Sequence, residues 1–329
     1  MNITVLGAGA WGSALAIHLS GRHPVTLWGW DSTQIETMRT TRFNQRYLPD
    51  IPLPEKLNLT SDLYSACNNS ELILIAVPIS ALRTTLQEIV AMPVQIPVIW
   101  GCKGFEAGTS KLPHQVAAEI LPQKLPCGVL SGPSFALEVA RGLPTAMILA
   151  SRDGEFAQII ARSLHHSSLR IYSSNDVIGV EVGGAVKNAL AIAAGIAEGM
   201  GFGQNARAGL ITRGLAEMTR LGLKMGARAD TLSGLSGAGD LILTCTGDLS
   251  RNRQVGILLA QKQALPDILK HLGHVAEGVG TVREVHYLAQ KLGVDMPICT
   301  AVYSVLYEQV PATLAVEILL NRATHSEFN

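Results

Sequence analysis

A glycine-rich turn near the start of the chain constrains the fold more than any other feature. An apolar strand pattern over residues 2–6 is followed at once by G-x-G-x-x-G, made of Gly7, Gly9 and Gly12, and then by a helical pattern over 11–20. The first glycine permits a tight turn, the second lets the backbone approach a pyrophosphate, and the third lets the helix pack on the strand. In this position the motif predicts a dinucleotide-binding unit rather than an ordinary glycine-rich turn.

Strand and helix patterns alternate through the first half of the chain. The segment 71–77, ELILIAV, is apolar on both faces, which is typical of a buried parallel strand. The alternation predicts an α/β domain of Rossmann type, a doubly wound parallel sheet with helices on both faces. Strands are expected at 2–6, 25–30, 71–77, 97–101, 127–131, 145–150 and 169–172, with helices that include 79–90 and 154–164.

The pattern changes near Asp176, after which no strand pattern is convincing. A chain of 329 residues is long enough for two domains. We therefore expect a dinucleotide-binding Rossmann domain over 1–176 and an all-α, substrate-binding and catalytic domain over 177–329. Helices of the second domain are expected at 181–199, 206–225, 251–263, 279–292 and 297–309.

Charge and cysteine content exclude several classes of partner. The chain carries 26 lysines and arginines and 26 aspartates and glutamates, so its formal net charge is zero and offers nothing for nucleic acid or an anionic membrane. Its five cysteines form no C-x-x-C pair and no grouping with histidines at metal-ligand spacing, so we expect free thiols and no metal. A strand that begins at residue 2 leaves no room for a signal peptide, and we expect every apolar run to be too short to span a membrane. These features predict a soluble cytoplasmic protein.

The end of the second strand bears on the choice of nicotinamide cofactor. An acidic residue there would hold the ribose 2′-hydroxyl of NAD, and a basic residue the 2′-phosphate of NADP. The chain has Trp30, which could stack on adenine, followed by Asp31, which comes slightly late for the acidic role. Arg39 and Arg42 reach a 2′-phosphate only if the following helix leans inward. NAD and NADP both remain open.

Unusual residues follow three other expected strands. Pro78 follows ELILIAV, Lys103 follows VIWGC, and Gly132-Pro133-Ser134 follows CGVLS. Ligands of open parallel sheets bind beyond the carboxyl ends of the strands, so these residues and the glycine turn point to one crevice. For Lys103 the alternative is an ordinary solvated surface lysine.

A lysine lies within an apolar helix. Lys187 occurs in EVGGAVKNALAIAAGIAEG, where it must reach solvent, pair with a carboxylate or line a cavity. Burial would lower its pKa toward neutrality, as a proton-transfer catalyst needs, and Asp240 is a plausible partner that would raise the pKa again. The alternative is a lysine that extends between packed helices to water.

The stretch 233–254, SGLSGAGDLILTCTGDLSRNRQ, concentrates polar chemistry in a chain with few charges. Its glycines let the backbone pass close to another element. A serine suited to capping a helix N-terminus precedes an arginine and an asparagine in the first helical turn, where an anion is favoured. The guanidinium matches phosphate oxygens, whereas Arg253 is expected to be an exposed arginine and is not assigned as a ligand. The candidate side chains are Asp240, Thr244, Ser250, Arg251 and Asn252.

Five motifs together resemble the NAD-dependent glycerol-3-phosphate dehydrogenase family, in its bacterial NAD(P)-using branch. They are GAGAWG, GCKG at 101–104, SGPSFA at 131–136, GGAVKN at 183–188 and SGAGDLILTC…SRNR at 236–253, in the family's order. The resemblance implies reversible reduction of dihydroxyacetone phosphate to sn-glycerol 3-phosphate by NADH or NADPH, which supplies phospholipid synthesis. Many family members carry His or Arg where this chain has Trp30, so the departure leaves an NADP preference open.

The resemblance also implies roles for individual residues. Lys187 is the proton donor and acceptor, held by Asn188 and Asp240, and Lys103 polarises the carbonyl. The positions that match substrate contacts are Lys103, Gly132, Ser134, Lys187, Asp240, Thr244, Ser250, Arg251 and Asn252. Those assigned to the cofactor are Gly7, Gly9, Ala10, Trp11, Gly12, Trp30, Pro78, Lys103, Ala136, Arg251, Val275 and Glu277.

Two other functions compete with this interpretation. One is another hydroxyacid or ketoacid reductase with a Rossmann domain and a helical domain, which would lack the phosphate-binding Ser-Arg-Asn. The other is a non-catalytic dinucleotide-binding protein, which would not need an acid–base lysine. The long apolar helices of the second domain favour a homodimer.

Overall fold

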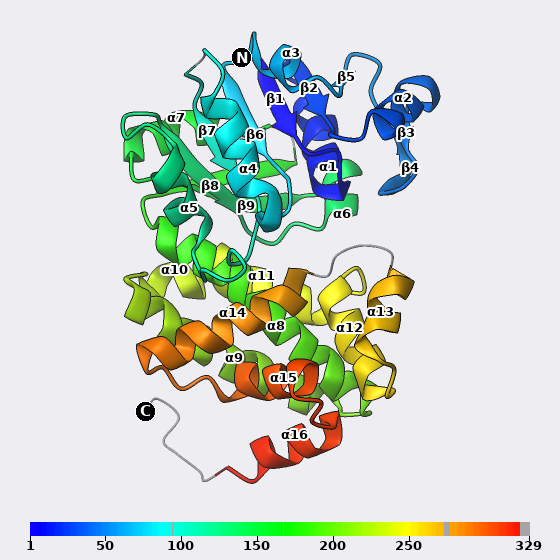
Figure 1. The fold of residues 1–329 in the computed structure, drawn as a ribbon, viewed down its shortest axis with the longest axis vertical. Coiled ribbons are helices and arrows are strands. Elements are labelled where there is room, and N and C mark those ends of the chain that lie inside the picture. Colours follow the sequence, from blue (N-terminus) through cyan, green and yellow to red (C-terminus); the bar gives the residue numbers. More distant parts are fainter. Residues whose placement is uncertain (94, 167, 273–276, 323–329) are drawn as a thin grey trace.

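The computed structural model describes residues 1–93, 95–166, 168–272 and 277–322. A sheet with its helices forms one half of the molecule, and a bundle of helices forms the other (Figure 1). The main sheet contains β1 (Ile3–Leu6), β2 (Val25–Trp28), β5 (Asn58–Thr60), β6 (Leu72–Ile75), β7 (Val98–Trp100), β8 (Cys127–Ser131), β9 (Thr145–Ala150) and β10 (Leu169–Ser174). Helices of this half are α1 (Ala10–Leu19), α2 (Ser32–Thr41), α3 (Leu63–Cys67), α4 (Ile79–Val90), α5 (Pro113–Ile120), α6 (Ala136–Ala140) and α7 (Gly154–Leu164).

The eight strands lie in the order β10-β9-β8-β7-β6-β1-β2-β5. β1 lies between β2 and β6 and pairs with both in parallel, with Ile3 opposite Val25 on one side and Leu72 on the other. The parallel series continues through β7 and β8. The carboxyl ends of β1, β6, β7 and β8 therefore meet at one edge of the sheet, as the sequence predicted.

The prediction of a parallel sheet is wrong at one junction. β9 pairs with β8 in antiparallel fashion and with β10 in parallel, so β9 and β10 run against the other six strands. After β8 the short helix α6 packs against α1, and the chain returns into the sheet from the edge it has just left. A separate hairpin of β3 (Phe43–Asn44) and β4 (Leu48–Pro52), and the edge strand β5, were not predicted.

The second half contains helices and connecting turns, with no strand among its described residues. Its elements are α8 (Val177–Gly199), α9 (Gln204–Met225), α10 (Ala229–Ser233), the π-helix η1 (Leu235–Gly239), α11 (Asp240–Thr246), α12 (Arg251–Ala260), α13 (Leu265–Leu272), α14 (Glu277–Leu292), α15 (Pro297–Tyr307) and α16 (Ala312–Leu320). α8 is the central element, and α9, α11, α12, α14 and α15 all pack against it.

α8 corrects the expectation that every apolar run is too short to span a membrane. By length and composition, Val177–Gly199 is the single described helix that could cross one. However, 94% of its apolar window is buried inside the protein. A helix that is apolar on all sides is expected at the centre of a bundle, and α8 occupies that place here.

Candidate active site

The glycine turn after β1 has the geometry that a pyrophosphate cradle needs. Gly7 has φ +118°, and a Cβ atom at Gly12 would lie 1.8 Å from the carbonyl oxygen of Gly7, so both positions exclude a side chain. A Cβ at Gly9 would meet nothing within 4 Å. Gly9 is the N-cap of α1 and provides no side-chain cap, which leaves first-turn N–H groups available to an anion. The residues present therefore fit a dinucleotide.

Other predicted cofactor residues surround this turn. Ala10 and Trp11 form the first turn of α1, Pro78 is the N-cap of α4 beyond β6, and Ala136 begins α6, which packs on α1. The indole Nε1 of Trp11 is buried and finds no hydrogen-bond partner in the described part of the chain. This indole N–H lies against the end of β7, where a Cβ at Gly101 would be 2.8 Å away from it.

Of the four candidate residues after β2, one has an exposed side chain, and the side chains of the other three form hydrogen bonds within the protein. Trp30 is 80% exposed. The carboxylate of Asp31 accepts hydrogen bonds from the N–H groups of Thr33 and Gln34 and so caps α2. Arg39 donates to the carbonyl oxygen of Leu59, at 2.7 and 3.1 Å. Arg42 likewise donates to backbone carbonyls, among them that of Pro54 at 3.1 Å. An aromatic face is therefore open at this site, while NAD and NADP both remain possible.

Close packing of α8 against η1 brings the catalytic candidates together. A Cβ at Gly183 would lie 2.4 Å from the carbonyl oxygen of Ser236, and one at Gly184 would lie 3.0 Å from Oγ of Ser131. The two glycines thus let α8 approach both the glycine-rich lead-in and the end of β8. One turn further along α8, Lys187 faces the start of α11.

One carboxylate joins the two lysines. Asp240 is 1% exposed and accepts from Lys187 Nζ at 2.5 Å through Oδ1 and from Lys103 Nζ at 2.6 Å through Oδ2. Lys187 also donates to Thr244 Oγ1 at 2.9 Å, and Lys103 donates to the carbonyl oxygen of Gly132 at 3.2 Å. Lys103, Lys187, Asp240 and Thr244 are here named the lysine cluster; they come from α8, α11 and the segment after β7, and Gly132 lies at the end of β8. Two ammonium groups with one carboxylate leave a net positive charge for an anionic substrate.

The environment of Lys187 favours proton transfer near neutral pH. The side chain is buried, with 7% of the residue exposed, so it does not extend to solvent. Burial is the main cause that lowers its pKa to about 8; Lys103 lowers it further, and Asp240 acts in the opposite direction. A general acid–base group works best when its pKa lies near the operating pH.

Two asparagines link α8 to α12 and α14. Asn252 Nδ2 donates to Asn188 Oδ1 at 3.0 Å, and Asn252 Oδ1 accepts from the N–H of Gly278 at 3.1 Å. The first turn of α12 is thereby tied to the residue beside Lys187 and to the start of α14. Of the predicted substrate residues, Ser134 lies at the β8 end and donates to the carbonyl oxygen of Gly132 at 3.0 Å.

The three polar residues at the start of α12 have different environments. Ser250 is buried and caps the helix by accepting from the N–H of Arg253 at 3.2 Å. Arg251 is exposed, and no hydrogen bond joins it to the lysine cluster. Arg253, expected to be exposed, is instead buried and holds Glu198 through two bonds of 2.6 and 2.8 Å, because α12 packs closely on α8.

The cofactor residues assigned after α13 are only partly described. Val275 lies outside the described residues. Glu277 begins α14, and burial raises the pKa of its carboxyl, while the positive charges of Arg251, Lys103 and Lys187 oppose that rise. Electrostatic interaction therefore connects Glu277 to both the lysines and Arg251.

Sequence reasoning missed one buried carboxylate beside the site. Glu284 is 3% exposed and accepts from the N–H of Gly108 and from Ser110 Oγ, on the segment that carries Lys103. Its position seven residues after Glu277 on the same helix was a signal, since this spacing puts both on one helical face. Nothing in the sequence showed which loop that face would meet.

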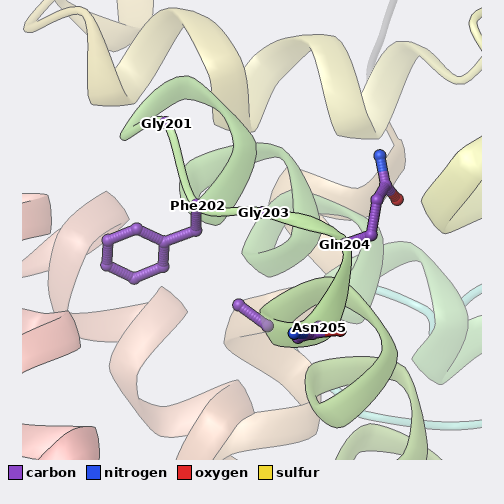
Figure 2. Close-up of a pocket in the computed structure, with 6 residues that line it drawn as sticks. Gly201, Phe202, Gly203, Gln204 and Asn205 are labelled. Carbon is purple, nitrogen blue, oxygen red and sulfur yellow. The ribbon is translucent and has the colours of Figure 1, made fainter.

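A surface hollow elsewhere offers no comparable chemistry. It is lined by Gly201, Phe202, Gly203, Gln204, Asn205 and Ala206 at the α8–α9 connection, where Phe202 and Gln204 point in different directions (Figure 2). None of its lining side chains carries a charge. In the described ranges, no three His, Cys, Asp or Glu side chains are grouped to hold a metal ion.

Comparisons with known proteins agree along the whole chain. The family model described as the NAD-dependent glycerol-3-phosphate dehydrogenase N-terminus matches residues 2–157, and the corresponding C-terminus model matches 176–317. Glycerol-3-phosphate dehydrogenase [NAD(P)+] of Nitrosospira multiformis is 60% identical over 332 residues, with 100% of each chain covered. The Nitrosomonas eutropha enzyme of that name is 58% identical, with 99% of each covered.

Solved structures give the same result. The crystal structure of glycerol-3-phosphate dehydrogenase from Coxiella burnetii is 42% identical with a TM-score of 0.93, and the match covers 98% of this chain and 99% of that one. D-mandelate dehydrogenase, at 16% identity and a TM-score of 0.60, shares the fold alone.

Proposed function

The chain belongs to the NAD-dependent glycerol-3-phosphate dehydrogenase family, and we propose that the lysine cluster is its catalytic centre. The enzyme is an oxidoreductase that interconverts dihydroxyacetone phosphate and sn-glycerol 3-phosphate with NAD or NADP, and so supplies glycerol 3-phosphate for phospholipid synthesis. One observation carries the assignment of the centre. Asp240 holds Lys187 at 2.5 Å and Lys103 at 2.6 Å where the strand ends meet α8.

The nucleotide side of the site is made from backbone. The turn at Gly7, Gly9 and Gly12, with the N-terminus of α1, would hold the pyrophosphate of the dinucleotide, whose nicotinamide would supply or accept the hydride. Trp30 presents an open aromatic face to the adenine, and Trp11, Pro78 and Ala136 line the surrounding wall. Glu277, at the start of α14, would complete the cofactor contacts from the helical half.

The two lysines transfer the proton and stabilise the negative charge that develops on the carbonyl oxygen. As the carbonyl carbon is reduced, negative charge develops on its oxygen, and Lys103 stabilises that charge. Lys187 donates a proton to the same oxygen, and it takes the proton back in the oxidation direction. Asp240 keeps both ammonium groups in place, and Thr244 and Asn188 orient Lys187. Because Asp240 remains paired with Lys103, the loss of a proton from Lys187 does not leave a buried carboxylate without a partner.

The start of α12 binds the substrate phosphate. Arg251 offers a planar guanidinium, and the first-turn N–H groups beside Ser250 and Asn252 add the positive end of the helix. Arg251 is exposed, which suits a group that engages a ligand from solvent. Gly132 and Ser134 line the opposite wall.

Substrate comparison tests this assignment. The purified enzyme is assayed for NADH and NADPH oxidation with dihydroxyacetone phosphate and, separately, with unphosphorylated dihydroxyacetone. We expect kcat/KM to be far higher for the phosphate ester, and equal turnover would contradict the phosphate site. A ketoacid reductase would prefer an unphosphorylated acid, and a non-catalytic dinucleotide-binding protein would oxidise neither cofactor. The ratio of kcat/KM for NADH and NADPH in the same assay decides the cofactor preference.

Three further assignments belong to this proposal. The division into a dinucleotide-binding domain over 1–176 and a catalytic domain over 177–329 is supported by β10 ending at Ser174 and α8 beginning at Val177. A cytoplasmic location is supported by five free thiols, all in the described part of the chain. A homodimer is supported by exposed Leu314, Ile318 and Leu320 on α16, and light scattering on the purified protein tests it.

A further inference from the structure

The loop that carries Lys103 is a closed unit that both halves of the molecule hold. This loop, residues 101–112, is here named the Lys103 loop. The N–H of Glu106 donates to the carbonyl oxygen of Lys111 at 2.8 Å, and that of Ser110 donates to the carbonyl oxygen of Glu106 at 3.0 Å. Phe105 and Leu112 are buried in the core of the helical half. The turn lies three residues beyond Lys103, so its position bears directly on the ammonium group.

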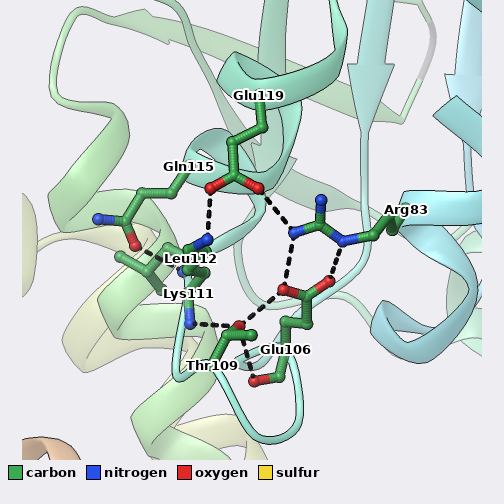
Figure 3. Close-up of polar contacts among 7 residues, drawn as sticks. All are labelled: Arg83, Glu106, Thr109, Lys111, Leu112, Gln115 and Glu119. Carbon is green, nitrogen blue, oxygen red and sulfur yellow. Dashed lines mark hydrogen bonds and ion pairs between the residues drawn. The ribbon is translucent and has the colours of Figure 1, made fainter. Parts of the chain in front are cut away.

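On the sheet side, an ion-pair network holds the loop (Figure 3). Arg83 of α4 forms two bonds with Glu106, at 2.7 and 2.9 Å, and one with Glu119 at 2.9 Å. Lys111 pairs with Glu119 as well. Arg83, Lys111 and Glu119 are between about a third and two-fifths exposed, so water and salt screen the pairs of Glu119, and each is expected to contribute little to stability. Glu106 is only 15% exposed, so its two bonds with Arg83 are screened less.

On the helical side, one face of α14 holds the loop. Oε1 of Glu284 accepts from the N–H of Gly108 at 3.1 Å, and Oε2 accepts from Ser110 Oγ at 2.7 Å. A turn earlier on α14, Thr281 packs so closely on Gly104 that a Cβ there would lie 3.1 Å from Thr281 Oγ1. Glu277, one turn further back, interacts electrostatically with Lys103. Glu277, Thr281 and Glu284 of α14 thus interact with the loop at successive points from Lys103 to Ser110.

The backbone of the loop needs this support. Gly104, Gly108 and Ser110 all have positive φ, and Ser110, with φ +52°, is the non-glycine member. A residue with a side chain is strained at such a φ unless its surroundings hold it. Because Glu284 is buried, removing its carboxylate leaves the donors of Gly108 and Ser110 without their acceptor and releases the strained turn.

We propose that Glu284 is a positioning residue, through which the helical half sets the place of Lys103 beside Asp240. The proposal rests on the function given above. Lys103 is the one member of the lysine cluster that comes from a loop, whereas Lys187, Asp240 and Thr244 lie on helices. A loop needs external contacts to hold a side chain to the accuracy that catalysis requires, and a misplacement of about 1 Å can cost up to 100-fold in rate.

The proposal predicts a signature that a purely structural role does not produce. Lys103 is one of the groups that lower the pKa of Lys187. If the loop moves and Lys103 withdraws from Asp240, that repulsion weakens and more water reaches the site, so the pKa of Lys187 rises. The alkaline limit of carbonyl reduction then moves to higher pH.

The test compares variants on the two sides of the loop. Glu284→Ala is expected to lower kcat about tenfold and to move the alkaline limit of ketone reduction upward. Glu284→Gln keeps one acceptor oxygen and should lie between Glu284→Ala and wild type. The matched control is Lys111→Met, which removes one screened ion pair from the same loop and should leave kcat and the pH profile unchanged.

A second measurement separates this proposal from the function on which it rests. The titration of Lys187 is followed by NMR with lysine labelled at ¹³Cε, its signal assigned from Lys187→Met, without substrate or cofactor. A higher pKa in Glu284→Ala supports positioning even if the wild type does not reduce dihydroxyacetone phosphate, a result that would overturn only the proposed function. Should Glu284→Ala not fold, Ser110→Ala removes one of the two bonds and should shift the pKa in the same direction. An unchanged Lys187 pKa in the folded variants, or an equal shift in Lys111→Met, overturns the proposal.

Discussion

The two halves of the molecule use different chemistry where they meet. In the sheet half, the turn at Gly7, Gly9 and Gly12 offers backbone N–H groups and space, with no charged side chain. In the helical half, buried Lys187 and Asp240 offer charge. A backbone cradle does not titrate, so its binding depends on shape and fixed N–H donors rather than on pH, whereas the buried charges respond to pH and to each other. The comparison teaches that cofactor recognition and proton transfer are separately adjustable in this fold.

The largest effect is expected on the charged side. Lys187→Ala removes the proposed proton donor, and we expect kcat to fall by roughly 10²–10⁴-fold with dihydroxyacetone phosphate. Asp240 stays paired with Lys103, so the variant should fold. Steady-state kinetics measure the loss, and Lys224→Ala, at an exposed position of α9, is the control that should leave kcat unchanged. A Lys187→Ala enzyme with nearly normal kcat would remove Lys187 from this role.

In the glycine turn of the sheet half, substitutions are expected to act through steric clashes. A methyl group at Gly12 would lie 1.8 Å from the carbonyl oxygen of Gly7, so Gly12→Ala should lower stability by about 3 kcal/mol, roughly 100-fold in the folding equilibrium. Thermal or urea unfolding measures this change. Gly9→Ala meets nothing within 4 Å and should unfold like wild type, yet it should bind NADH about tenfold more weakly because the methyl group occupies the cradle. Equal stability losses in both variants would contradict this account of the turn.

At the mouth of the site, the expected effect is on substrate binding. Arg251→Ala removes the guanidinium proposed to hold the phosphate, and KM for dihydroxyacetone phosphate should rise about 30-fold, which corresponds to about 2 kcal/mol. The control is unphosphorylated dihydroxyacetone, whose KM should not change. If KM for the phosphate ester stays at the wild-type value, the phosphate lies elsewhere.

The smallest expected effect is a pH dependence, which should appear in the lysine chemistry of the helical half and not in cofactor binding by the sheet half. With a Lys187 pKa of about 8, the protonated fraction falls from about one half at pH 8 to about one tenth at pH 9. Ketone reduction needs the protonated lysine and should slow roughly fivefold over this interval. Oxidation of glycerol 3-phosphate needs the neutral amine and should rise as the pH passes 8. Cofactor affinity, set by the backbone cradle, should stay nearly constant, and rates that change in the same direction for both reactions would refute this role.

Most of the elements, and the pairing of Lys187 with Asp240, were predictable for identifiable reasons. The strand–glycine–helix order at residues 2–20 reflects local backbone geometry, which only glycine at positions 7 and 12 allows. Lys187 stood out because a charge in an apolar helix needs a partner. The reversal at β9 was not predictable, since an apolar strand has the same residue pattern whether its neighbour is parallel or antiparallel. The burial of Arg253 was missed because Glu198, its partner, is 55 residues away.

The sequence by itself determined the dinucleotide turn, the change from an α/β half to a helical half, and the types of side chain available for proton transfer and phosphate binding. These follow from local rules: backbone conformations that require glycine, periodic burial, and the cost of an unpaired charge. Only the tertiary structure decided that one carboxylate serves both lysines and that Glu284 supports the loop of Lys103. Contacts between distant segments depend on how whole elements pack, and that packing is a collective property of the fold rather than of any single stretch of chain.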